Sequence, residues 1–170
     1  MKGAELDATL LKWRGYLGAL GLPFVIYQSM CLGLIRNGEF FDERVVELAV
    51  LWDDVKDKLD ALMAPPHQYT HTNAHAADGG LMYFKDAEIQ VVCFKNGKAV
   101  YNPLDSTCLV FSEELLKREN WTKYRYLDLD WNLPGNPEQY LTEAYGDWRT
   151  PHPGYRWYTD ANNLVSWGEI

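Results

Sequence analysis

Residues 136–151, NPEQYLTEAYGDWRTP, carry the strongest local folding signal in the chain. Asn136 suits a helix N-cap, Pro137 suits the first helical position, and Gly146 can end the helix in a left-handed conformation. One face of that helix is apolar, which predicts that it packs on a core. The residues on this face are Tyr140, Leu141, Ala144 and Tyr145.

The helix runs directly into a turn, Gly-Asp-Trp-Arg-Thr-Pro, at 146–151. A tryptophan flanked by two opposite charges and closed by Pro151 predicts a structural corner, with Trp148 buried. Asp147 and Arg149 are then expected to pin the turn at its surface. We predict a role in closing the fold here, rather than in catalysis.

Length and composition predict one folded domain over residues 1–170. Hydrophobic residues make up 47% and aromatic residues 14% of the chain, enough for a substantial core. The net charge of −8 argues against a nucleic-acid partner, because phosphate-binding proteins depend on clustered Lys and Arg. It equally disfavours binding to anionic membranes. An acidic surface suits a basic protein partner, or simply keeps the protein in solution, and solubility is the simpler explanation.

Cys31, Cys93 and Cys108 show no paired spacing, and each has apolar neighbours. Buried, reduced thiols are therefore expected, which favours a cytoplasmic protein. The N-terminal residues are amphipathic, unlike a signal peptide. Residues 16–34 lean apolar but are interrupted by Pro23 and by polar positions, so no membrane span is predicted.

Hydrophobic periodicity predicts helices and strands in mixed order, and hence an α+β fold with helices packed on a small mixed sheet. Asn96-Gly97 between alternating strands predicts a β-hairpin. Residues 65–80 are expected to form an exposed loop, and 122–131 one exposed-edge strand. Helices are predicted from residue 6 to about 21 and over 30–36, 51–62 and 112–119, and strands over 23–27, 44–50, 81–94 and 98–102.

Four segments together resemble the LicD and fukutin-like family, whose members have a nucleotidyltransferase fold and move phospho-alcohols from CDP-linked donors onto glycans. They are a strand at 24–27, SMCLGLIRNG at 29–38, VVELAVLWDDVKDKL at 45–59, and EIQVVCF at 88–94. The turn at 146–151 matches the closing motif of that family. The resemblance implies a nucleotidyltransferase-like fold, with a nucleotide or phospho-alcohol ligand.

The resemblance also implies a binding site for that ligand at the short helix. Its start brings backbone amides toward the donor phosphates, and its end carries an arginine. The residues implied in substrate binding are Ser29, Gly33, Arg36 and Gly38. For Arg36, a structural salt bridge is an equal alternative.

The carboxylates that hold paired Mg²⁺ in such enzymes are largely replaced here. In the family frame the first falls on Val45, the second on Glu47 and the third on Gln90, with Glu88 on the same strand face as Gln90. One carboxylate and one amide do not hold two divalent ions, since hard cations need several charged oxygens. Glu47 and Glu88 remain the candidate catalytic residues, with at most one weakly bound Mg²⁺.

Asp128 and Asp130 are the rival metal pair, because alternation on one strand would place both on one face; a solvated edge is the simpler interpretation. Other candidates are weaker. Asp53 and Asp54 precede a helical stripe and suit a helix N-terminus. Three histidines recur every four residues, as zinc ligands on a helix do, yet their segment begins with Pro-Pro and favours a loop. These histidines are His67, His71 and His75.

Three functional hypotheses follow. The preferred one is a LicD/fukutin-like pseudoenzyme with degraded metal chemistry, acting as a binding or regulatory module. The second is an active metal-dependent transferase of a phospho-alcohol or nucleotidyl group. The third is an acidic interaction or scaffold protein.

Overall fold

The computed structural model describes residues 1–104 and 106–170. Across these residues, eight strands form a mixed sheet and two more form a separate hairpin. In the mixed sheet, β5 is the longest strand and pairs with β2, β4 and β6. The sheet strands are β1 (Val25–Ile26), β2 (Val46–Leu51), β3 (Tyr69–Asn73), β4 (Leu81–Phe84), β5 (Ala87–Lys95), β6 (Lys98–Tyr101), β7 (Thr107–Ser112) and β10 (Leu164–Ser166).

The first half of β5 is central to the sheet. β2 runs parallel to it on one side, and β4 runs antiparallel on the other. β5 then extends beyond both strands and forms the hairpin with β6, which leads to β7 and β10. The parallel register places Glu47 of β2 directly opposite Glu88 of β5. Two candidate acids, far apart in sequence, therefore lie side by side.

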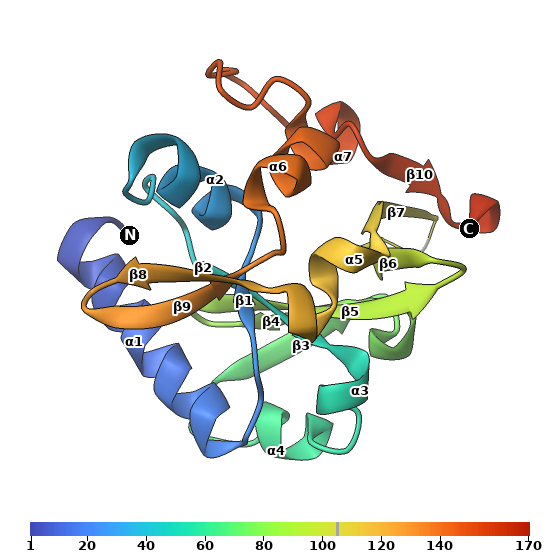
Figure 1. The fold of residues 1–170 in the computed structure, drawn as a ribbon. Helices are drawn as coiled ribbons and strands as arrows, with labels where there is room; N and C mark the ends of the chain where they lie inside the picture. The colour runs from blue at the N-terminus through green and yellow to red at the C-terminus, as the bar shows by residue number, and fades with distance from the viewer. Residues whose placement is uncertain (105) are drawn as a thin grey trace.

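Helices cover both faces of the sheet (Figure 1). On one side, α2 and α6 lie next to each other, and on the other side lie α1, α3 and α4. The short α5 follows β7, and α7 lies in the C-terminal segment. Their bounds are α1 (Gly3–Ala19), α2 (Gln28–Asn37), α3 (Trp52–Val55), α4 (Leu59–Met63), α5 (Glu113–Leu116), α6 (Pro137–Tyr145) and α7 (Trp157–Asp160). The predicted α+β fold, with helices packed on a mixed sheet, is confirmed.

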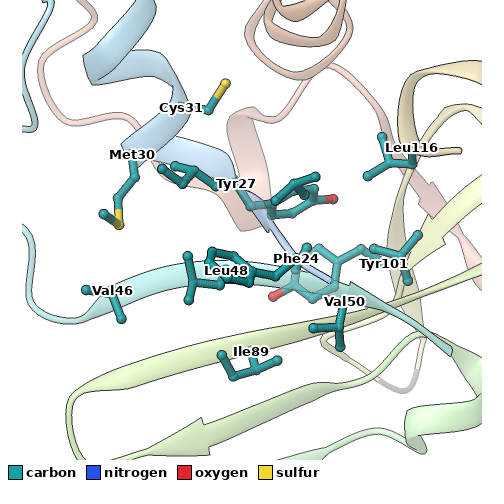
Figure 2. Packing of buried hydrophobic residues seen from close by; sticks show 14 of the residues in the cluster. Phe24, Tyr27, Met30, Cys31, Val46, Leu48, Val50, Ile89, Tyr101 and Leu116 are labelled. Carbon is teal, nitrogen blue, oxygen red and sulfur yellow. The ribbon is translucent and has the colours of Figure 1, made fainter. Parts of the chain in front are cut away.

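The core between α2 and the sheet is built around Tyr27 (Figure 2). Its ring is fully buried and meets the rings of Tyr101, Phe111 and Tyr140. Met30 also points from α2 toward β2, where its sulfur accepts a hydrogen bond from the Glu47 amide. This packing fixes the start of α2 over the end of β2 where Glu47 lies.

Several local predictions are confirmed. Asn136 accepts a hydrogen bond from the Gln139 amide and caps α6, which ends at Gly146 with φ of 67°. Asn96 and Gly97 both have positive φ and form the β5–β6 turn. Trp148 is buried, as predicted for the corner after α6. In each case a residue with a specific backbone preference sets the local structure.

Four secondary-structure predictions are wrong. The strand expected over 81–94 is two antiparallel strands, β4 and β5, which are separated at residues 85–86. The stripe at 51–62 is split into α3 and α4, and 122–131 is a hairpin of β8 (Thr122–Tyr126) and β9 (Leu129–Leu133) rather than one strand. The expected loop at 65–80 contains β3, which pairs with β4. Tyr69, Thr70 and Thr72 favour extended backbone, and β4 supplies the hydrogen-bond partners of this polar strand.

The aromatic C-terminal segment is held against the rest of the fold. β10 pairs antiparallel with β7, and the Asn163 amide side chain donates to the Val110 carbonyl. Among the described residues, no helix is long and apolar enough to cross a membrane.

Candidate functional site

A cleft of about 950 Å³ lies over the start of α2 and the adjoining ends of β2 and β5. One wall is formed by the sheet and α2, and the facing wall by the segment after α6. Charged and aromatic residues dominate the lining. The lining residues include Ser29, Arg36, Phe41, Glu43, Arg44, Val45, Glu47, Tyr83, Glu88, Gln90, Tyr101, Tyr145, Asp147, Trp148, His152, Tyr155, Arg156, Trp157 and Tyr158.

Ser29, at the start of α2, brings two glutamates together. Its hydroxyl lies 2.9 Å from Glu43 Oε1 and 2.9 Å from Glu47 Oε2, and its backbone N–H donates to Glu47 Oε2 at 3.2 Å. One hydroxyl proton serves only one of these carboxyl groups at a time. A proton shared within this cluster therefore stabilises the arrangement.

The pKa of Glu47 is raised to about 8, first by burial and then by the negative charges of Glu43 and Glu88. The hydrogen bonds from Ser29 offset only part of this rise. Burial also raises the pKa of Glu43, and its bond from Ser29 opposes that shift. At neutral pH Glu47 is therefore mostly protonated, and the floor of the cleft is less anionic than its glutamates suggest.

Glu88 has a different partner. Its carboxylate forms an ion pair with Arg44, a residue whose side chain is 77% exposed. Burial raises the pKa of Glu88, while the positive charge of Arg44 lowers it. Although Glu47 and Glu88 share a register, Glu88 is thus engaged by a cation from its own protein.

The donor set of the cleft does not fit a pair of Mg²⁺ ions. Val45 supplies no oxygen and is 5% exposed, and Gln90 is a neutral amide that is 2% exposed. Among the described residues, no three His, Cys, Asp or Glu side chains are grouped so as to hold a metal ion. Hard divalent ions need several charged oxygens at one point, and the cleft offers the Ser29-linked pair of glutamates instead.

Arg36 lines the cleft from the last turn of α2. Its Nη1 donates to the Trp148 carbonyl at 3.2 Å, and its guanidinium lies 5.0 Å from the centre of the Phe41 ring. The corner after α6 therefore contacts the cleft as well as closing the fold. In turn, Trp148 Nε1 donates to Thr142 Oγ1 of α6 at 3.2 Å.

The facing wall is aromatic. The ring centres of Tyr145 and Tyr155 lie 5.1 Å apart. Those of Trp157 and Tyr158 lie 5.7 Å apart in an edge-to-face arrangement. The Tyr145 hydroxyl also donates to Gln28 Oε1 at 3.4 Å, which joins this wall to the start of α2. Aromatic faces of this kind bind rings by stacking.

The structure places four of the predicted site residues in the cleft: Ser29, Arg36, Glu47 and Glu88. Gly33 and Gly38 do not line it. Gly33 is needed for packing, because a Cβ there would lie 2.8 Å from the Glu39 carbonyl oxygen. Gly38 has a φ of 74° and ends α2. Their substrate-binding roles remain predictions, and the fold accounts for both glycines without them.

Asp128 and Asp130 lie outside the cleft, on the β8–β9 hairpin. The premise that they share a strand face is wrong, because Asp128 is in the turn with φ of 57° and Asp130 is on β9. Asp130 instead pairs with Arg125 at 3.3 Å. The turn therefore prevents the alternation on one strand that would have placed Asp128 and Asp130 on the same face.

The three histidines do not form a cluster. His67 is buried, with Nδ1 2.9 Å from the Leu62 carbonyl, whereas His71 lies on β3 and stacks on Tyr83 at 4.4 Å. His75 follows β3 and accepts from the Ala77 amide. The spacing of four loses its meaning off a helix, as expected. At the start of α3, Asp53 and Asp54 instead pair with Lys56 and Arg118.

Sequence reasoning missed Glu43, Arg44 and the aromatic wall. Glu43, Arg44 and Val45 lie just before β2 and line the cleft together with Glu47 of that strand. No local pattern indicated that Tyr155 and Trp157 return to face α2. That contact depends on the path of the chain after Gly146.

The strand order, the helices on the sheet and the cleft over α2 together define a nucleotidyltransferase-like fold. The crystal structure of the lincosamide antibiotic adenylyltransferase LnuA, with lincomycin bound, is similar with a TM-score of 0.54 and 10% sequence identity. The match covers 83% of this chain and 87% of that one. No protein-family model matches the sequence, and no curated protein matches it.

Proposed function

We propose that this chain is a LicD/fukutin-like pseudoenzyme that binds a nucleotide or phosphorylated alcohol in the cleft as a binding or regulatory module. The observation that carries this proposal is the donor set around Glu47. Val45 and Gln90 stand where the family resemblance expects metal-binding acids, and Arg44 engages Glu88. The cleft thus keeps the shape of a ligand site without the charged oxygens of paired metal ions.

The size and lining of the cleft support a small-molecule ligand. A volume of about 950 Å³ is at the upper end of the usual range for ligand pockets. Its aromatic wall offers stacking surfaces for a ring, and Arg36 adds a positive charge to the lining. Because Glu47 is mostly neutral at pH 7, an anionic ligand meets less repulsion from the floor.

Calorimetric titration with CDP-ethanolamine, CTP and ATP tests this proposal, in EDTA and in Mg²⁺ or Mn²⁺. We expect at least one of these ligands to bind in EDTA and remain intact during incubation with Mg²⁺. Binding that requires a divalent ion and disappears in Glu47→Ala, or release of CMP or pyrophosphate, would contradict it. Absence of binding by a folded protein would favour the acidic interaction protein.

An active transferase is the second candidate, and one observation favours it. Glu47 and Glu88 are directly opposed in the parallel β2–β5 register, and Glu43 adds a third carboxyl group nearby through Ser29. If Arg44 moved away from Glu88, these acids could together bind at most one divalent ion. The Arg44→Ala variant would then bind Mg²⁺ more tightly than the wild type, measured by the same titration.

A further inference from the structure

Arg36 is a cationic residue of the cleft that is held in place by neutral groups. Its contacts are the Trp148 carbonyl at 3.2 Å, the Asn37 side-chain oxygen at 3.4 Å and the face of Phe41. None of the ion pairs formed by the described residues includes it. No carboxylate among the described residues therefore pairs with this guanidinium, although Arg36 is half-buried and lines the cleft.

The guanidinium also keeps donors to spare. An arginine has five N–H groups in a planar fork, and the two contacts to neutral oxygens use only part of them. Phe41 covers one face of the fork, and the Trp148 carbonyl fixes its rotation. A charged, oriented fork with free donors suits the tetrahedral oxygens of a phosphate, because charge-assisted bonds are stronger than neutral ones.

We propose that Arg36 binds the phosphate of the cleft ligand directly, and that the corner at Trp148 positions it. This inference rests on the proposed ligand-binding function and adds the group that Arg36 recognises. In this cleft an arginine supplies the positive charge that paired metal ions do not. Phosphate binding is accordingly independent of divalent cations.

A hydrogen bond to α6 holds the corner at Trp148. Thr142 Oγ1 accepts from Trp148 Nε1, and the Trp148 carbonyl accepts from Arg36 Nη1. Thr142 is exposed and does not line the cleft, so it does not touch a ligand there. Thr142→Val removes the acceptor at nearly constant volume and loosens the corner from outside the site.

Calorimetry in EDTA with inorganic pyrophosphate and CDP tests the binding role. We expect Arg36→Gln to weaken both by about 10- to 100-fold, the usual size of a lost charge-assisted hydrogen bond. Arg36→Lys keeps the charge without the fork and should lie between that variant and wild type. Malonate, a dicarboxylate, should bind more weakly than pyrophosphate.

Arg14→Gln is the matched control. Arg14 also lies over an aromatic ring, 4.7 Å from Trp131, and donates to a backbone carbonyl, that of Asp130, yet it lies outside the cleft. Its substitution removes the same charge and should leave the affinity for pyrophosphate unchanged. An equal loss in Arg14→Gln and Arg36→Gln would overturn the proposal, since net charge alone would then explain both.

A double-mutant cycle tests positioning. Thr142→Val should weaken pyrophosphate binding several-fold in the wild type and have no effect in the Arg36→Gln background. The same loss in both backgrounds, or none in either, would refute the positioning role. If wild type binds CDP in EDTA and Arg36→Gln binds it equally well, the phosphate assignment fails while the proposed function stands. Absence of ligand binding by the wild type would overturn both.

Discussion

Replacing Glu47 with glutamine should stabilise the protein at alkaline pH. In the folded chain the pKa of Glu47 is about 8, against an ordinary value of 4.5 that applies once the chain unfolds. Between these two values the folded state binds more protons than the unfolded state, so the free energy of unfolding falls as pH rises. Below about pH 4.5 Glu47 is protonated in both states, and the penalty vanishes.

The size of the effect follows from the difference between the pKa of Glu47 in the folded and the unfolded chain. Each pKa unit corresponds to about 1.4 kcal/mol, which sets an upper limit of about 5 kcal/mol above pH 8. Glu47 is partly exposed at the cleft and coupled to Glu43 and Glu88, so solvent and proton sharing reduce the measurable part. We expect Glu47→Gln to gain on the order of 2 kcal/mol at pH 9 and much less at pH 5.

Urea denaturation followed by tryptophan fluorescence measures this difference at pH 5, 7, 8 and 9. Glutamine retains an oxygen for the Ser29 amide, so the local geometry is preserved. Asp53→Asn is the control, because this carboxylate is on a side chain that is 83% exposed and lies outside the cleft. Unfolding curves for Glu47→Gln and wild type that differ by a constant amount from pH 5 to 9 would refute the reasoning.

Three further predictions concern the metal positions and the fold. The double substitution Val45→Asp and Gln90→Glu should create Mg²⁺ binding. It should raise the free energy of unfolding by about 1.4 kcal/mol when the Mg²⁺ concentration is ten times Kd. Thermal melts with and without Mg²⁺ check this, and identical midpoints would count against the assigned positions. Gly33→Ala should cost about 1–3 kcal/mol by denaturant unfolding, because its Cβ meets the Glu39 carbonyl oxygen at 2.8 Å. Asn136→Ala should cost about 1 kcal/mol through loss of the α6 cap; Asn136→Asp, which keeps the acceptor, should recover most of it.

The sequence determined those parts of the fold that depend on residues close together in the chain. Asn136, Pro137 and Gly146 bound α6, and Asn96-Gly97 form the β5–β6 turn, because backbone preferences of single residues settle such structures. The short helix and the strand that carry Ser29 and Glu47 were also predicted, since hydrophobic periodicity marks each of them. Glu47 and Glu88 became candidate acids through the family resemblance of these segments, and not through periodicity.

The tertiary structure decided which of these groups meet. Ser29 joins Glu43 to Glu47, and Arg44 engages Glu88, through contacts that no local pattern specifies. The polar segment at β3 became a strand because β4 offered it hydrogen-bond partners. Burial and neighbouring charge then set the pKa of Glu47, and the return of the chain after α6 placed Trp148 beside Arg36. Charge state and recognition in this cleft arise from long-range packing, because each depends on groups brought together only by the complete fold.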